Sequence, residues 1–566
     1  MNTFYRNYWS LFVQFIEDFY NVKYKNIPLP LLSAFHFYLD DDLKRQMREV
    51  SFSKVLRTKI IKENQIQSHF DLYLNNINQH NKLAPPGKIL IHEGDLLRFP
   101  QDYLRSFDKR TTELLFSSKM KNTKAYHKHL KNLKEIGKVH LLDNHRENVE
   151  NLKNQYIAEI KSLFAQYKEH IVYSNENFKQ KFIEDIPVMV DLLVAYENFF
   201  NKVPISCVIV GNTSGMFSRI LTLIANSKGI PTICTQHGII ASELGYLPAF
   251  ASKYAVYGYY EKEWYLKKGV PSDSIEITGH PRFDHIFTNE HMSKQKLIKL
   301  LNIGPKKKLV FIATNFNREL NIWSTFIKEL QKNPFITIII KPHPTEERRL
   351  GIQHYKELSA KYNSVKLVPA SMNLYDIIAN VDVVVQELST AGLEAMLFNK
   401  PVFCLRKKDY YDQNDRYYYE KLTEFSETNP KNLSKIIVRF LNDGKMQKHN
   451  KLRQKEFLSF AYPQTLSGDK IHNLLHKVTY QKSYSSKAFE DGTIVKGTEA
   501  PIYLIYKGKK HHILSPFIFK KLGCKVNDVL MVSDQILKSI PDGSNINRDN
   551  LFEFIRIRKE GSTDVF

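Results

Sequence analysis

The chain has 566 residues, of which 43% are hydrophobic and 25% are charged. These proportions are ordinary for a folded globular protein and exclude a disordered or fibrous one. The length exceeds the usual size of a single hydrophobic core, so two or three domains are expected. No segment approaches the roughly 20 apolar residues that span a bilayer, and Glu17 and Asp18 lie where a signal peptide needs an apolar run. We expect a cytoplasmic protein.

The formal net charge is +23, from 82 Lys and Arg against 59 Asp and Glu. This excess of positive charge indicates an acidic partner, which is nucleic acid, anionic lipid headgroups or a phosphorylated substrate. Zinc-finger spacing, RNA-binding aromatic signatures and helix-turn-helix patterns do not stand out, so we expect no nucleic-acid partner. The excess favours an enzyme with an anionic substrate that lies peripherally at the inner face of an anionic cell membrane.

We expect no metal site. The four cysteines, Cys207, Cys234, Cys404 and Cys524, are far apart and make no metal or redox spacing, which favours buried free thiols. The run 40–42 is three aspartates, but a helix-forming segment follows it, so an acidic helix start explains it better.

Residues 1 to about 200 favour helices, because apolar residues recur at three- and four-residue spacing over 145–170. We expect one strand to interrupt them, at 88–91. From 205 the chain alternates between β-rich and helical segments, which predicts parallel sheets covered by helices. The expected strands are 205–210, 232–235, 275–278, 309–313, 336–341, 365–368, 381–386 and 402–405.

The run 309–405 can form a nearly complete doubly wound unit alone, so the earlier strands should form another. The expected fold class is therefore α/β, with two Rossmann-like domains facing a cleft, a helical N-terminal elaboration and a small C-terminal β-rich module. We expect an acceptor-side domain at 1–270, a nucleotide-donor domain at 271–480 and the module at 488–566. The module resembles a short unit of bacterial surface and cell-wall proteins in its segment 503–513, which suggests attachment to a partner or glycan.

Four short polar islands follow expected strands, where open parallel sheets present side chains to ligands. They are 235–238, 279–284, 341–344 and 387–394. In the third, His343 lies between two prolines that stiffen its backbone, so it could donate to a phosphate oxygen beside Lys341. The alternative is an exposed histidine in a proline-rich turn.

In the last island, Ser389, Thr390 and Gly392 precede a predicted helix. Hydroxyl groups and free backbone N–H groups at a helix start can seat an anion, although an ordinary N-cap has the same sequence. Glu394 lies one turn further, where it could bind ribose hydroxyls or complement the helix dipole.

His237 could take a proton from an acceptor hydroxyl near neutral pH, or could be a structural histidine. Arg282 could contact phosphate, and Asp284 could be its salt-bridge partner. Glu93, after the expected strand at 88–91, is a weaker candidate for an acidic base. The segment 211–215 lacks the lysine of a P-loop, but its Asn212 and Ser214 could line the acceptor side.

The order of these islands resembles the two-domain GT-B transferases that build bacterial surface polymers. The nearest likeness, over roughly 200–410, is to CDP-glycerol glycerophosphotransferases of teichoic acid synthesis and related capsule glycosyltransferases. The resemblance rests on His237-Gly238, the stretch 279–284, His343-Pro344, and Ser389-Thr390 with Glu394. It implies that His237 activates the acceptor, while His343, Ser389 and Thr390 bind the phosphates of the nucleotide.

The sequence departs from that family in having Glu394 where an aspartate is usual and Gln236 where an aromatic residue precedes the histidine. The donor therefore stays open between CDP-glycerol and a CMP- or UDP-linked sugar, with no further cofactor. Glu93-Gly94 partly matches the acid-acid-glycine motif of capsule sialyl- and Kdo-transferases. We expect transfer of a glycosyl or glycerophosphate group to a surface-polymer or lipid-linked acceptor. The alternatives are a nucleotide-sugar 2-epimerase and a non-catalytic protein that binds glycans or surfaces.

Overall fold

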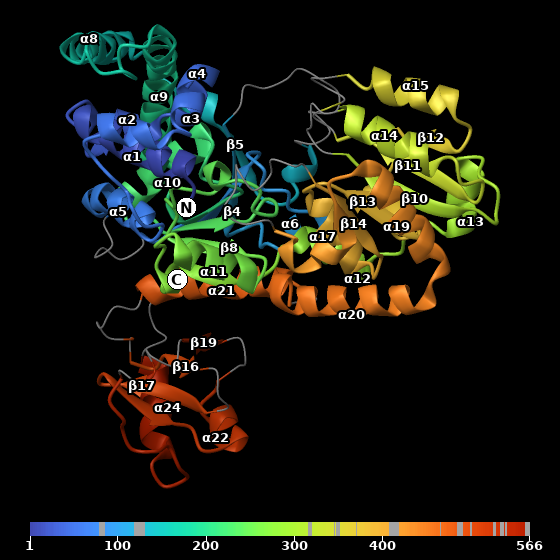
Figure 1. The fold of residues 1–566 in the computed structure, drawn as a ribbon. Helices are drawn as coiled ribbons and strands as arrows, with labels where there is room; N and C mark the ends of the chain where they lie inside the picture. Colours follow the sequence, from blue (N-terminus) through green and yellow to red (C-terminus); the bar gives the residue numbers. More distant parts are fainter. Residues whose placement is uncertain are drawn as a thin grey trace.

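Two α/β lobes lie side by side in the computed structural model, and a small third unit lies apart from them below the first lobe (Figure 1). The structure describes residues 1–78, 85–117, 131–314, 320–343, 346, 351–369, 371–406, 418–463, 466–483, 489, 491–497, 501–524, 528–532, 537 and 540–560. The expected fold class is confirmed: two Rossmann-like parallel sheets, a helical N-terminal layer and a β-rich module.

The first sheet has seven strands in the order β5-β4-β3-β6-β7-β8-β9, and every neighbouring pair is parallel. The order reverses between β3 and β6, and such a reversal is where ligands bind in open α/β sheets. The strands are β3 (Lys88–Glu93), β4 (Thr112–Phe116), β5 (Lys138–Leu141), β6 (Ile205–Val210), β7 (Thr232–Thr235), β8 (Lys253–Val256) and β9 (Ile275–Ile277).

The expectation of a single strand in the first 200 residues was wrong, because β4 and β5 also belong to this sheet. Both strands contain ionisable residues. Glu113 of β4 is buried and pairs with His140 of β5 at 2.7 Å and with Lys88 of β3 at 2.8 Å. Charged residues inside short strands interrupt the apolar pattern by which buried strands are recognised.

The second sheet has six parallel strands in the order β12-β11-β10-β13-β14-β15, with the same reversal between β10 and β13. The prediction that 309–405 forms a doubly wound unit is confirmed. The strands are β10 (Lys308–Ala313), β11 (Ile336–Lys341), β12 (Val365–Leu367), β13 (Val383–Gln386), β14 (Val402–Leu405) and β15 (Ser426–Glu427). Its helices include α13 (Lys294–Leu300), α14 (Leu320–Leu330), α15 (Gln353–Lys361), α16 (Leu374–Ile378), α17 (Thr390–Leu397), α19 (Pro430–Asn442) and α20 (Gly444–Ala461).

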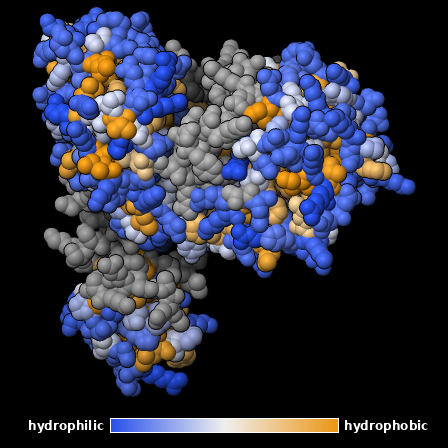
Figure 2. Space-filling model, viewed as in Figure 1, coloured by the Kyte–Doolittle hydropathy of each residue, from blue (hydrophilic) through white to orange (hydrophobic). Residues whose placement is uncertain are grey.

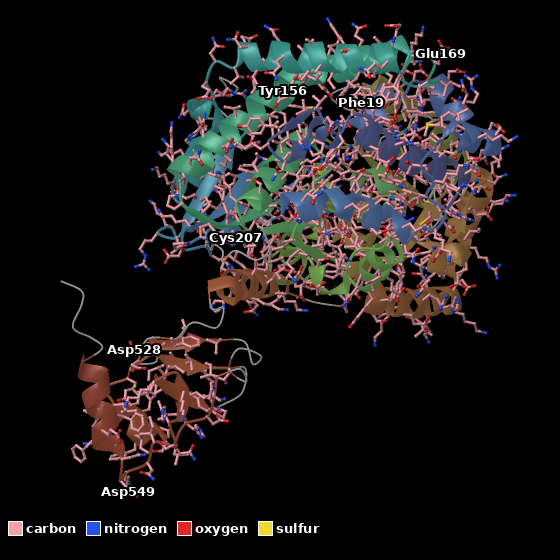
Figure 3. The ribbon with its side chains drawn as sticks, turned by 90° about the vertical axis from the view of Figure 1, so that its left-hand side faces the viewer. Phe19, Tyr156, Glu169, Cys207, Asp528 and Asp549 are labelled. Atoms are coloured by element: carbon pink, nitrogen blue, oxygen red, sulfur yellow. The ribbon has the colours of Figure 1, made fainter. Side chains whose placement is uncertain are left out.

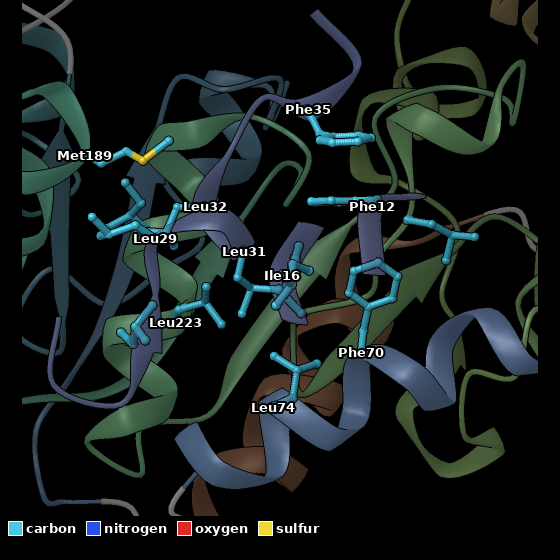
Figure 4. Packing of buried hydrophobic residues seen from close by; sticks show 14 of the residues in the cluster. Phe12, Ile16, Leu29, Leu31, Leu32, Phe35, Phe70, Leu74, Met189 and Leu223 are labelled. Carbon is cyan, nitrogen blue, oxygen red and sulfur yellow. The ribbon is translucent and has the colours of Figure 1, made fainter. Parts of the chain in front are cut away.

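A layer of helices covers one face of the first sheet and is joined to it by an aromatic core. Phe12 and Phe35 stack with ring centroids 4.6 Å apart, and Phe70 packs beside Phe12 (Figure 4). The expected helix over 145–170 is confirmed as α8. The helices of this layer are α1 (Thr3–Asp18), α2 (Leu29–Leu32), α3 (Phe35–Tyr38), α4 (Asp41–Gln46), α5 (Gln65–Ile77), α8 (Glu150–Gln166), α9 (Glu176–Lys202) and α10 (Met216–Ser227).

The other face of the first sheet is covered by α21 (Gly468–Ser483), a helix that follows the second domain in the chain. Ile471 and Leu474 of α21 share a buried cluster with Cys207 of β6. The chain therefore crosses back to the first domain after α20. The end of α20 packs directly on the segment before α11 (Tyr259–Lys267), since a Cβ on Gly258 would lie 2.3 Å from the carbonyl oxygen of Ala461. The expected boundaries at 270 and 480 stay predictions.

The third unit is built on a four-stranded sheet, which confirms the expected β-rich module. Figure 3 shows Asp528 and Asp549 on this unit, apart from the domain that carries Tyr156 and Cys207. Its elements are β16 (Ile494–Lys496), β17 (Ile502–Tyr506), β18 (Lys509–His512), β19 (Val529–Met531), α22 (Pro516–Lys521) and α24 (Leu551–Glu560).

Other expectations of the sequence concern the surface and the thiols. All four cysteines are buried free thiols, as predicted. Asp40 caps the N-terminus of α4, where its carboxylate accepts from the backbone of Leu43 at 2.8 Å, which confirms the acidic helix start. Within the described ranges, no helix combines the length and the apolarity that crossing a membrane demands. Hydrophilic residues dominate the face seen in Figure 2.

Candidate active site

Loops from both domains meet at the carboxyl ends of the two sheets. The loop after β7 carries His237, and α17 begins after β13 in the other domain. The backbone N–H of Ile239 donates to Thr390 Oγ1 at 3.3 Å, and a Cβ on Gly238 would lie 3.3 Å from the same hydroxyl oxygen. The first and last of the predicted islands are therefore in direct contact across the two domains.

The imidazole of His237 is half-buried and stacks on Tyr246, with ring centroids 4.7 Å apart and an interplanar angle of 5°. Burial, together with the positive charges of Arg98 and Arg282, lowers the pKa of His237 to about 3. The ring is therefore neutral at neutral pH, and its free nitrogen can accept a proton.

The side chain of Gln236 fixes the turn that carries His237. Its Nε2 donates to the carbonyl of Gly238 at 2.7 Å and to Glu261 Oε1 at 3.0 Å, while its Oε1 accepts from the N–H of Tyr257 at 2.8 Å. Because Gln236 is buried, each of these bonds replaces one to water and fixes the turn. An aromatic side chain at this position could not make this set of bonds.

Arg282, in the segment that follows β9 of the first sheet, reaches Glu394 of α17, with Nη2 lying 3.5 Å from Glu394 Oε1. Tyr375 donates to the same carboxylate oxygen at 3.2 Å. Burial lowers the pKa of Arg282, but the neighbouring Tyr257 and Glu394 outweigh it, so the net shift is upward. The Nε and Nη2 atoms of Arg282 are buried without a hydrogen-bond partner among the described residues.

Asp284 is not the salt-bridge partner of Arg282 that the sequence suggested. It does not pair with Arg282; its carboxylate accepts from the backbone of Ser467 at 2.9 Å and of Gly468 at 2.9 Å. These are the residues at the start of α21, so Asp284 ties the second domain to the helix that crosses back to the first.

Ser389 is the N-cap of α17, and its Oγ accepts from the N–H of Ala391 at 3.2 Å. Its carbonyl accepts from the hydroxyl of Tyr419 at 2.6 Å. A Cβ on Gly392 would lie 2.7 Å from that hydroxyl oxygen, so the glycine leaves room for Tyr419. Ser389 and Thr390 remain partly exposed at the helix start.

Lys341 and His343 lie at the end of β11, on the same sheet edge as Ser389. One strand, β10, separates β11 from β13, which places the two strand ends about 10 Å apart. The N–H of His343 lies 3.0 Å from Thr314 Oγ1 and 2.9 Å from Glu346 Oε2, and Lys341 Nζ lies 3.4 Å from the carbonyl of Pro369. Pro344 falls outside the described residues.

The remaining predicted residues flank the reversal point of the first sheet. Glu93 is half-buried at the end of β3. Asn212 is buried, and its side chain donates to the carbonyl of Asp95 at 2.6 Å and accepts from the hydroxyl of Ser214 at 3.2 Å. The amide of Asn212 and the hydroxyl of Ser214 thus connect two loops at this edge.

No group of three His, Cys, Asp or Glu side chains among the described residues could hold a metal ion.

Arg98 is a residue of this site that no sequence motif indicates. Its Nη1 donates to the carbonyl of His237 at 2.8 Å, so this exposed guanidinium lies at the same site. The signal that could have found it is its position: it lies five residues beyond the end of β3, at the reversal point of the first sheet, where ligand-binding loops gather.

The site thus consists of two Rossmann-like domains, with a histidine loop of one in contact with a hydroxyl-bearing helix start of the other. Residues 259–476 match the family described as CDP-Glycerol:Poly(glycerophosphate) glycerophosphotransferase. This match confirms the expected resemblance and the expected transferase. No curated protein matches the sequence of the chain.

Solved structures with a similar fold include a co-structure of MnaA from S. aureus with UDP, at 13% identity and a TM-score of 0.46, covering 71% of this chain and 100% of that one. UDP-GlcNAc 2-epimerase from Neisseria meningitidis matches at 13% identity and 0.44, over 69% and 99% of the two chains. The wall teichoic acid polymerase TagF matches at 14% identity and 0.41, over 75% and 95%. Similarity at these scores carries no argument about activity.

Proposed function

We propose that the protein transfers glycerol phosphate from CDP-glycerol to a hydroxyl group of a bacterial surface polymer of the teichoic acid type. The observation that carries the proposal is the contact between the His237 loop and the start of α17, which lie in opposite domains. A proton acceptor and a hydroxyl-bearing helix start can then act on one substrate. The match of residues 259–476 to the glycerophosphotransferase family supports the choice of the transferred group.

In the proposed reaction, the acceptor hydroxyl oxygen attacks the phosphorus that carries the glycerol. The new O–P bond forms as the bond to the CMP oxygen breaks, and CMP leaves with that electron pair. His237 takes the hydroxyl proton, for which its neutral ring is ready. Arg282, Lys341, His343 and the helix start at Ser389 and Thr390, beside Gly392, would stabilise the charge on the phosphates, with Glu394 holding Arg282 or the ribose.

The acceptor would approach from the first domain, past Glu93, Asn212 and Ser214, and the donor would lie against the second. The formal charge of +23 suits an enzyme that works on a phosphate polymer, and it favours a peripheral place on an anionic membrane where a lipid-linked acceptor begins. The third unit would hold the growing polymer or another surface partner near the cleft.

The test is release of CMP from CDP-glycerol in the presence of a lipid-linked glycerol phosphate acceptor, with UDP-GlcNAc as the rival donor. We expect CMP release that depends on the acceptor. A donor at 100 times its dissociation constant should also stabilise the protein by about 2.7 kcal/mol in thermal unfolding.

Three results would contradict the proposal. Transfer from UDP-GlcNAc but not from CDP-glycerol would make the protein a glycosyltransferase. Conversion of UDP-GlcNAc without any acceptor would make it a 2-epimerase. Retention of the polymer without turnover of either donor would make it a binding protein.

A further inference from the structure

The loop that follows β3 has an unusual backbone. Gly94, Asp95, Leu96 and Arg98 have φ angles of 109°, 41°, 68° and 55°, so three residues with side chains occupy the left-handed region in a stretch of four. L-residues adopt that region rarely, and each such residue costs free energy that the surroundings must supply. Strain of this kind gathers at functional sites, where it holds a side chain in a required place.

Buried hydrogen bonds hold this loop from the first domain. The carboxylate of Asp95 accepts from the N–H of Ser218 at 3.0 Å, and also from its hydroxyl. Asn212 donates to the carbonyl of Asp95, and Gly211 leaves the space that Leu97 needs, since a Cβ on Gly211 would lie 2.1 Å from the backbone nitrogen of Leu97. The loop is therefore fixed before any ligand binds.

His280 connects this loop to Arg282. Its Nε2 donates to the carbonyl of Leu97 at 3.1 Å, next to Arg98, and its Nδ1 accepts from the N–H of Arg282 at 3.2 Å. The ring is fully buried. One imidazole thus sets the spacing between the loop after β3, which carries Arg98, and the segment after β9, which carries Arg282.

The guanidinium groups of Arg98 and Arg282 are near enough to interact, since burial and the charge of Arg282 lower the pKa of Arg98, and Glu394 acts on both arginines. Arg282 has Glu394 beside it, whereas Arg98 forms no ion pair with any described residue and donates instead to the carbonyl of His237. Two N–H-bearing atoms of Arg282 have no hydrogen-bond partner in the described chain. Two cations held together against their repulsion, with unused donors, form a site for an anion with several acceptor oxygens.

We propose that Arg98 and Arg282 bind the diphosphate of the nucleotide donor between them, with His280 fixing their spacing. This rests on the proposed function, and it extends it by making the first domain a part of the donor site. Because Arg98 is hydrogen-bonded to the carbonyl of His237, the same contact would set the distance between the diphosphate and the proton-accepting ring.

The test is calorimetric titration of the full chain with CDP, CMP, UDP and inorganic pyrophosphate. The informative variant is Arg98→Gly, because glycine prefers a positive φ and the protein should fold at least as well without the side chain. We expect affinity for CDP and pyrophosphate to fall at least tenfold, affinity for CMP to fall less, and the thermal midpoint not to fall. Arg98→Lys should recover part of the loss, since it keeps the charge without the planar fork.

The control is Arg110→Ala, which removes an exposed arginine of the same domain and should change no affinity. A double-mutant cycle with Arg282→Lys tests whether one anion is shared, since ligands of the same phosphate should give non-additive losses. Unchanged CDP affinity in Arg98→Gly, with a loss in Arg282→Lys, would overturn this inference and leave the proposed function standing. A parent protein that binds none of the four probes would overturn both.

Discussion

The backbone N–H of Ile239 donates a hydrogen bond to Thr390 Oγ1 at 3.3 Å, which joins the loop of His237 to the first turn of α17. A single hydroxyl thus connects the proton acceptor of one domain to the helix start of the other. Thr390 is partly exposed, so its side chain can be substituted without disturbing the core.

We expect Thr390→Val to reduce kcat/KM for CDP-glycerol by about 2- to 12-fold, which corresponds to the loss of one ordinary hydrogen bond of about 0.5–1.5 kcal/mol. Thr390→Ser should restore most of the activity because it restores the acceptor. Thr325→Val, which removes an exposed hydroxyl on α14, is the control. Unchanged kcat/KM in Thr390→Val would show that this hydroxyl does not contribute to turnover.

His237→Ala should lower kcat by about 10²- to 10⁴-fold, the usual contribution of a positioned general base. The affinity for CDP should stay within a few-fold, because the ring is placed to meet the acceptor. The exposed His449 serves as the control position, through His449→Ala. Full turnover by the His237 variant in a CMP-release assay would assign the base to another residue, and Glu93→Gln would then be the next variant to measure.

Much of the fold could be predicted because buried parallel strands are recognisable in the sequence as short apolar runs. Every strand expected between 205 and 405 is present, since each is a short apolar run bounded by polar residues. The strands β4 and β5 were not recognised, because Glu113 and His140 interrupt their apolar runs. The strand β8 was not recognised because it has only four residues and begins with Lys253. The ion pairs that compensate for the first two are formed only after the strands align.

The site could be predicted only in part, for a similar reason. Motifs at strand ends located His237 and Thr390, which do meet. Arg98 has no motif, and its contact with His237 depends on a left-handed loop that sequence patterns do not reveal. Likewise, the roles of Asn212 and Gly392 depend on neighbours 117 and 27 residues away in the chain, Asp95 and Tyr419, which only tertiary packing brings close.

The pH dependence of kcat/KM should show no loss of activity near pH 6.5, where an ordinary histidine titrates. The value reports the free enzyme, in which burial and the two arginines hold the pKa of His237 at about 3, so the base stays deprotonated from pH 5 to 8. In Arg98→Gly one positive charge is gone, so the pKa should rise and an acid limb should move toward pH 5. A wild-type acid limb centred at pH 6.5 would contradict this.

Gly392 permits a test of packing at the helix start separately from chemistry. Alanine there would place a Cβ 2.7 Å from the hydroxyl oxygen of Tyr419 and 3.1 Å from Gln386 Cδ, both of which are buried. Since both side chains are also hydrogen-bonded to Ser389, they cannot move away freely. Overpacking of this kind costs about 1–3 kcal/mol, so Gly392→Ala should lower the thermal midpoint by several degrees.

The matched control for that variant is Gly444→Ala, at the first position of α20, where an added Cβ meets nothing within 4 Å. This change should leave the thermal midpoint equal or slightly higher, because alanine loses less backbone entropy on folding. Activity gives the second measurement. If Gly392→Ala kept its stability and lost donor affinity, the glycine would be serving the approach of a phosphate to the backbone, and the packing explanation would be wrong.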